Sequence, residues 1–196
     1  MKPAAEYQIV RPGLAFWQGY DPGVKTDLCC CAFETADGLV FCDPVPLAAD
    51  AMEELLEGGT PRGILITSAN HERNAVALAR QYGIEIWANA WARGKIAATR
   101  WFEEGEVLFG AEAISLEGFA AGETAFWVDG LLVVGDALIN TAPYGFSMLP
   151  DKYCDDSKLA RESLKKLLRF PVLIIAFAHG LPIVSQAGER LAGLLR

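Results

Sequence analysis

The chain has 196 residues, of which 52% are hydrophobic, and a formal net charge of −8 at pH 7. This apolar content can fill a substantial core, and we expect a single domain over residues 1–196. The negative charge disfavours a general nucleic-acid binder or a protein that binds anionic membranes. Because there is no apolar run of membrane-spanning length and no signal-like segment, we expect a cytoplasmic protein that is a monomer or a homodimer.

The N-terminal third of the chain is typical of antiparallel strands. The turn residues Ala36-Asp37-Gly38 predict a hairpin, and Asp43-Pro44 ends the ladder because proline cannot donate a sheet hydrogen bond. An amphipathic helix follows at residues 48–57 and stops at Gly58-Gly59. The expected strands are residues 7–10, 14–19, 28–34 and 38–42.

The central stretch at residues 63–87 predicts a strand, a polar turn, a helix and a second strand. Residues 64–67 form a short apolar run that is typical of a buried strand. Ala75, Leu78, Ala79 and Tyr82 then recur at helical spacing before Gly83, a typical helix stop. Because polar residues at the carboxyl end of a strand often form sites in α/β proteins, the turn after residue 67 is the first candidate site.

The remaining chain repeats the order of strands, helix and strand. Residues 88–100 have no clear assignment, and residues 139–153 are expected to be a long loop rich in aromatic side chains. A helix is expected at residues 156–169, and Ser185 is expected to cap a final helix. The repetition predicts two sheets face to face with helices outside. The expected strands are residues 106–109, 113–117, 124–128, 131–134 and 172–177.

Several segments stand out in order along the chain: the hairpin at residues 33–44, the stretch Thr67-Ser68-Ala-Asn70-His71-Glu72-Arg73, residues 117–126, Gly135-Asp136 and Ala178-His179-Gly180. Together and in this order, they resemble the metallo-β-lactamase fold. The resemblance implies an α/β (α+β) fold, a four-layer αββα sandwich, and a hydrolase ancestry in which two metal ions activate a hydroxide.

The residues that the resemblance assigns to metal binding have changed. The first metal site of the family would use positions 68, 70 and 119, which hold Ser68, Asn70 and Phe119, so binuclear zinc is not expected. The second site would use positions 72, 73 and 179. The resemblance implies one divalent ion, manganese, iron or zinc, held by Glu72, Asp136 and His179, or no metal at all.

The alternative hypothesis is that Arg73 replaces the metal. Asn70 would then cap the helix, and His71 and Arg73 would lie in its first turn, where positive charge is unfavourable. The Arg73 guanidinium would need a partner: Asp136, Glu123 or an anionic ligand. We therefore expect a small anionic molecule as the ligand, with Ser68 and Asn70 beside it.

Two classes of function follow from these residues. The first is a divergent hydrolase of a small anionic ester-like substrate that uses Asp136, His179 and His71, the histidines acting as acid or base if no metal is bound. The second is a catalytically silent protein that binds a ligand or partner in the same cleft. Cys29, Cys30 and Cys31 lack CxxC spacing and are expected to be buried thiols, with a redox role only if one is exposed.

Overall fold

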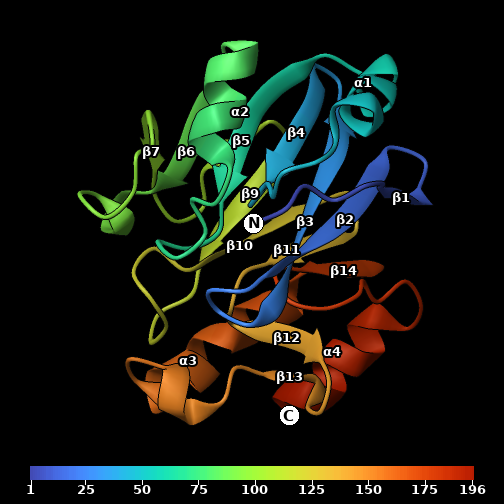
Figure 1. Cartoon of the computed structure of the whole chain (residues 1–196). Coiled ribbons are helices and arrows are strands. Elements are labelled where there is room, and N and C mark those ends of the chain that lie inside the picture. The colour runs from blue at the N-terminus through green and yellow to red at the C-terminus, as the bar shows by residue number, and fades with distance from the viewer.

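Two β-sheets lie face to face in the computed structural model, which describes all 196 residues (Figure 1). The larger sheet contains, in spatial order, β1 (Gln8–Arg11), β2 (Leu14–Asp21), β3 (Thr26–Thr35), β4 (Gly38–Cys42), β5 (Pro61–Ile66), β6 (Glu85–Asn89) and β7 (Arg100–Phe102). The smaller sheet runs from β8 (Val107–Leu108) through β9 (Ala111–Ser115), β10 (Thr124–Val128) and β11 (Leu131–Val134) to β14 (Ile174–Phe177).

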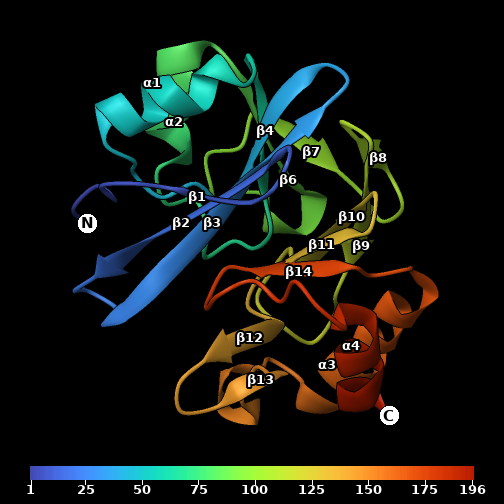
Figure 2. The same cartoon turned by 90° about the vertical axis from the view of Figure 1, so that its right-hand side faces the viewer.

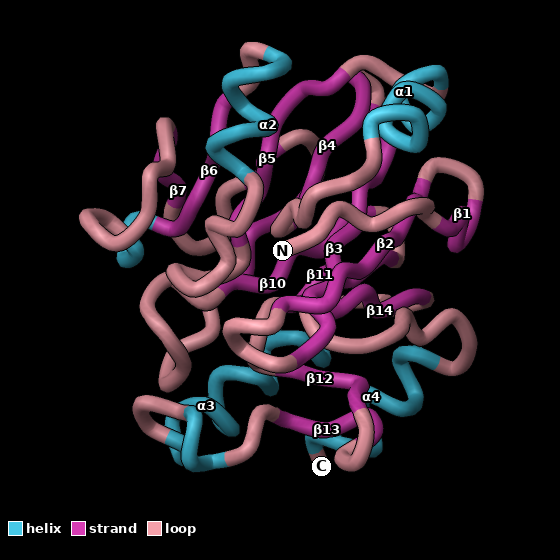
Figure 3. Tube along the Cα trace, viewed as in Figure 1, coloured by secondary structure: helices cyan, strands magenta, loops and turns pink.

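Helices cover the outer face of each sheet (Figures 2 and 3). Helices α1 (Ala49–Glu57) and α2 (Ala75–Tyr82) pack on the larger sheet, and α3 (Ser157–Leu164) and α4 (Ala187–Leu195) pack on the smaller one. Short 3₁₀ turns are η1 (Ala90–Ala92), η2 (Asp151–Tyr153) and η3 (Lys165–Arg169). These four layers confirm the expected αββα sandwich. None of the helices has the length and apolar character needed to cross a membrane.

The core has an apolar cluster in each of the three spaces between the layers. Side chains alternate across β3, so Cys30 packs under the helices while Cys31 packs between the sheets. Cys29, Cys30 and Cys31 are at most 3% exposed, and all five cysteines are free thiols. Burial raises the pKa of Cys29 to about 11. The expectation of buried thiols is confirmed.

The carboxyl ends of four strands gather at one edge of the sandwich. β4 is parallel to β5 in the larger sheet, and β11 is parallel to β14 in the smaller one. The two sheets are joined at this edge because the Cys29 amide in β3 donates to the Ala178 carbonyl, which follows β14, at 2.8 Å. Loops that leave these strand ends therefore meet, as is common for sites in α/β proteins.

The expected loop at residues 139–153 contains regular structure instead. β12 (Leu138–Thr141) and β13 (Gly145–Met148) form an antiparallel hairpin that precedes η2. Leu138 and Ile139 are buried, and Phe146 packs against the helix-covered core of the smaller sheet. Tertiary packing, which local sequence patterns do not report, stabilises these two strands.

Two helix starts also differ from expectation. Helix α2 begins at Ala75 after Asn74, so Asn70 is not its cap and the loop before the helix is four residues longer. Helix α4 follows Gln186, which has a φ of +52° and no capping side chain, so Ser185 does not cap it. In contrast, Asp156 caps α3 by accepting from the Lys158 and Leu159 amides at 3.0 Å.

Candidate metal centre

The loop between β5 and α2 directs the His71 side chain towards the interior of the protein. The His71 amide donates to the Ser68 carbonyl at 2.9 Å, and the Ser68 hydroxyl accepts from the Asn70 amide at 3.3 Å. Arg73 has a φ of +42°, so the backbone here is not helical. His71 is consequently only 3% exposed, whereas Glu72 is directed elsewhere.

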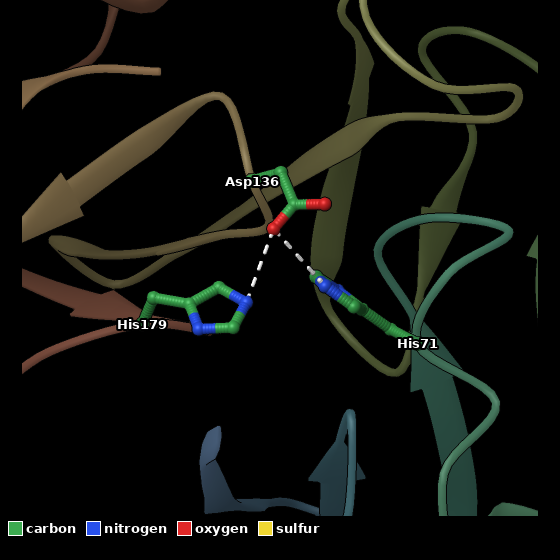
Figure 4. Close-up of side chains that lie close together, drawn as sticks. All are labelled: His71, Asp136 and His179. Carbon is green, nitrogen blue, oxygen red and sulfur yellow. Dashed lines mark ion pairs between the residues drawn. The ribbon is translucent and has the colours of Figure 1, made fainter. Parts of the chain in front are cut away.

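His71 and His179 converge on one carboxylate oxygen (Figure 4). The Nε2 atoms of His71 and His179 lie 3.3 Å and 3.2 Å from the same Oδ1 of Asp136. His71 comes from the larger sheet, while Asp136 and His179 follow β11 and β14 of the smaller one. The three potential ligand atoms lie within 4.8 Å of one another. The structure therefore brings together three of the residues singled out from the sequence.

The other ring nitrogen of each histidine faces an acceptor. His71 Nδ1 lies 2.9 Å from Asp43 Oδ2, an oxygen that also accepts from the Thr67 hydroxyl. The Thr67 amide donates to the remaining Asp43 oxygen at 2.8 Å. His179 Nδ1 lies 3.3 Å from the Asp27 carbonyl. With a proton on each Nδ1, each Nε2 can serve as a metal ligand once it carries no proton, the tautomer that metal-binding histidines use.

The carboxylates and histidines of the cluster stabilise one another's charged forms. Burial and the Arg73 charge act to lower the pKa of His71, but the Asp43 and Asp136 carboxylates outweigh them and raise it to about 9. Burial acts to raise the pKa of Asp136, yet His71 and His179 hold it well below its usual range. Burial likewise opposes ionisation of Asp43, whose pKa is lowered by His71. Both carboxylates are therefore anionic at neutral pH.

Two of the three separations in the cluster fit a divalent metal ion. Ligand atoms about 2.0–2.1 Å from a tetrahedral ion are about 3.3 Å apart, which matches the two separations from Asp136 Oδ1. Two imidazoles and one carboxylate suit zinc, iron or manganese, and a set of three leaves a position free for water or substrate. A metal-binding histidine usually donates its other ring N–H to an acceptor, as Nδ1 of His71 and of His179 can do here.

Glu72, an expected ligand, lies outside this cluster. Its Oε2 accepts from the Ala97 amide at 2.5 Å. The assignment of Glu72 followed the resemblance, which places a ligand at position 72, whereas the structure points the adjacent residue, His71, at Asp136 instead.

Arg73 does not pair with Asp136, contrary to the alternative hypothesis. Its Nη1 donates to the carbonyls of Cys29 and Asp43 at 2.6 Å and 3.1 Å, and its Nη2 donates to the carbonyl of Ala178 at 3.3 Å. The partners of Asp136 are His71 and His179. The guanidinium thus links the strand ends through hydrogen bonds to their carbonyls. Its positive charge has no carboxylate partner.

The other candidate residues have different surroundings. Ser68 is buried, and its hydroxyl accepts a hydrogen bond within its own turn. Phe119 packs in the core of the smaller sheet. Glu123 is also buried: its Oε1 accepts from the Ala137 amide at 2.9 Å, and its Oε2 has no partner. Burial and the nearby Asp136 charge raise the pKa of Glu123 to about 8. Of these residues, only Asn70 is exposed at the mouth of the site.

Two adjoining basins open onto the cluster. The first, about 700 Å³, is lined by polar and apolar residues that include Asn70, His71, Arg73, Asp136 and His179. The second, about 450 Å³, shares Asn70, Asp136 and His179 with it. Their sizes are typical of small-molecule sites.

Asp43 and Thr67 were not identified as site residues from the sequence. Asp43 was seen only as the end of a hairpin, and Thr67 only as the end of a strand. Asp43 follows β4 and is buried, and its φ of +49° is uncommon for a residue other than glycine. Such a φ is a structural observation, so sequence reasoning could not use it.

Comparison with known families identifies the superfamily of the chain. A family model described as the metallo-beta-lactamase superfamily matches residues 7–194. The chain belongs to this superfamily. A search of curated protein sequences gives no match.

Solved structures show the same fold as this superfamily member. VMB-1 is 11% identical with a TM-score of 0.73, covering 100% of this chain and 98% of that one. A beta-lactamase domain protein from Burkholderia ambifaria is 17% identical with a TM-score of 0.72, covering 99% and 77%. TTHA1623 in a di-iron-bound form is 23% identical with a TM-score of 0.64, covering 86% and 93%. These identities establish the fold alone.

Proposed function

We propose that the protein is a hydrolase that uses one divalent metal ion to cleave a small anionic ester-like substrate. The observation that carries the proposal is the convergence of His71 and His179 on Asp136, with both outer nitrogens held by acceptors. Membership of a superfamily with a hydrolase-like character supports the reaction class. Binuclear chemistry is not proposed, because Ser68 and Phe119 stand where its further ligands would be needed.

Each side chain of the cluster has a separate role in the proposed reaction. A divalent ion held by His71, Asp136 and His179 would polarise the ester carbonyl and acidify water. Asp43 keeps the proton of His71 on Nδ1. Asp136 uses Oδ1 towards both histidines, and its pKa, held well below the usual range, makes it a ligand rather than a base. Water adds to the carbonyl carbon, the ester C–O bond breaks, and the leaving alkoxide takes up the proton that the water loses, which yields an acid and an alcohol.

The anionic character of the substrate is inferred from Arg73. This residue lines the larger basin and has no ion-pair partner. A guanidinium near a partly enclosed cavity attracts carboxylate or phosphate groups. The net charge of −8 disfavours polyanions, which leaves a small anion as the expected class.

The first test measures metal content and activity together. Untagged protein should contain near-stoichiometric zinc, iron or manganese, and it should hydrolyse members of a panel of carboxylate- or phosphate-bearing esters. The double variant Asp136→Ala, His179→Ala should lose both metal and activity. The surface variant Asp155→Ala is the matched control, because Asp155 is exposed and far in sequence from the cluster.

The same experiment separates the second candidate function, a catalytically silent ligand binder in the same cleft. A binder would use Arg73 and the two basins to hold its ligand, and it would need no metal ion. Protein that takes up no metal even after incubation with zinc, iron or manganese, and that cleaves no ester, would contradict the hydrolase proposal and favour the binder.

A further inference from the structure

The second basin differs in chemistry from the first. Of the 12 residues that line the first basin three are hydrophobic, against six of 12 in the second. Arg73 and Asn74 line only the first. The walls that belong to the second basin alone are Ala120, Ile139, Thr141, Tyr144, Leu149, Pro150 and Tyr153. The cleft therefore has a side that carries Arg73 and a side, called the tyrosine side here, that carries Tyr144 and Tyr153. The two sides share Val24, Thr26, Asn70, Asp136 and His179.

The tyrosine side is hydrogen-bonded to the segment that carries His179. It is built mainly from the β12–β13 hairpin and the segment that follows (Figure 1). The Asn140 amide in β12 donates to the His179 carbonyl at 3.0 Å, and its side-chain amide donates to the Leu181 carbonyl at 2.8 Å. A Cβ at Gly180 would clash with the Asn140 carbonyl oxygen, so this contact requires glycine. The hairpin consequently holds a fixed position relative to His179.

Two tyrosines of this side are exposed. Tyr144 is 55% exposed and Tyr153 is 60% exposed, although both line the basin. Behind them, Phe146 packs edge-on against Phe177 with ring centroids 5.8 Å apart, which anchors the hairpin to β14. Exposed aromatic rings on a fixed support gain favourable burial when an apolar group binds against them.

We propose that the second basin binds an aromatic or similarly compact apolar group of the substrate. That group lies across Asp136 and His179 from the anionic group at Arg73, so the bond to be cleaved lies between them. The substrate class is therefore an ester with a small anion on one side and an aryl or apolar group on the other. This inference rests on the proposed function for its reaction, and on the shared walls of the two basins for its geometry.

The test uses binding of two acids that differ only in a phenyl ring. Chelator-treated protein is titrated with 4-phenylbutyrate and with butyrate by calorimetry. We expect 4-phenylbutyrate to bind about tenfold more tightly or better, because a buried ring contributes at least that much. The double variant Tyr144→Ala, Tyr153→Ala should lose most of this preference. Tyr20→Ala is the matched control, since Tyr20 is 56% exposed and lines neither basin.

A second variant obstructs the basin rather than truncating its wall. Ala120 lines the second basin alone, so Ala120→Trp should weaken binding of 4-phenylbutyrate and leave that of butyrate unchanged. Equal affinity of the wild-type protein for the two acids, or an unchanged preference in both variants, would overturn the inference.

The outcome is independent of catalysis. Binding of 4-phenylbutyrate with the expected variant effects, by a protein that hydrolyses no ester, would support this inference and contradict the proposed function. Hydrolysis of anionic esters with no preference for an aryl group would do the reverse.

Discussion

Asp43 fixes the orientation of the His71 ring. Its Oδ2 lies 2.9 Å from His71 Nδ1, and its Oδ1 accepts from the Thr67 amide. We predict that Asp43→Asn weakens metal binding by about 10- to 100-fold, because the outer carboxylate that orients the ligand is lost. The dissociation constant is measured by competition with a chromophoric chelator.

The control for this variant is its fold without metal. The asparagine oxygen can still accept from the Thr67 amide, so the circular dichroism spectrum of chelator-treated Asp43→Asn should match that of the wild type. An unchanged metal affinity in a folded variant would show that His71 is positioned without Asp43.

Glu123 is a buried acid with one unpartnered oxygen. Its pKa is raised from an ordinary value of 4.5 to about 8, first by burial and then by the Asp136 charge. Between pH 4.5 and pH 8 the unfolded chain is ionised at this residue while the folded protein keeps the proton. Stability is therefore lost as the pH rises through this window.

We predict that Glu123→Gln removes this loss. Relative to the variant, chelator-treated wild-type protein should lose on the order of a few kcal/mol of unfolding free energy between pH 5 and pH 9. Urea denaturation of both proteins at each pH measures the difference, and the other titrating groups cancel in the comparison. A constant difference across this range would mean that Glu123 is ionised throughout.

At the scale of the elements, the loop between β5 and α2 is fastened by Arg73. Its guanidinium donates to carbonyls at Cys29 in β3, at Asp43 after β4 and at Ala178 after β14. We predict that Arg73→Met destabilises the protein by about 2–4 kcal/mol, because several buried carbonyls lose a charged donor. Thermal or urea denaturation in phosphate-free buffer measures the loss.

Arg80→Met is the matched control for this substitution. Arg80 is exposed near the end of α2, so its replacement should change stability by no more than about 0.5 kcal/mol. Equal melting of Arg73→Met and the wild type would contradict the role of Arg73 as a fastening between strand ends.

The sequence predicted the fold better than the site for a physical reason. Apolar periodicity and turn residues located most strands, and the ordered segments pointed to the sandwich. The site depends on a loop without periodicity, in which the path of residues 68–74 decides that His71 points inward and Glu72 outward. Similarly, the β12–β13 hairpin gains its stability from packing on the smaller sheet, which local sequence patterns do not report.

At the scale of the whole molecule, the candidate metal centre joins the two sheets. His71 follows a strand of the larger sheet, whereas Asp136 and His179 follow strands of the smaller one. An ion bound by all three residues links the N-terminal and C-terminal halves of the chain. Because the unfolded chain offers no such site, binding adds to stability, by about 2.7 kcal/mol when the free ion is at 100 times its dissociation constant.

The pH dependence of this binding reports on His71. In the metal-free protein Asp43 and Asp136 raise the pKa of His71 to about 9, and an ion can bind only the unprotonated Nε2. Each ion bound below pH 9 must therefore displace one proton. We predict that the apparent zinc affinity rises by up to about tenfold per pH unit from pH 6 to pH 8 and levels off near pH 9. Chelator competition at each pH measures it. A flat profile would show that His71 is not a ligand, and the partner of Asp136 and His179 would then have to be sought among the other residues of the cleft.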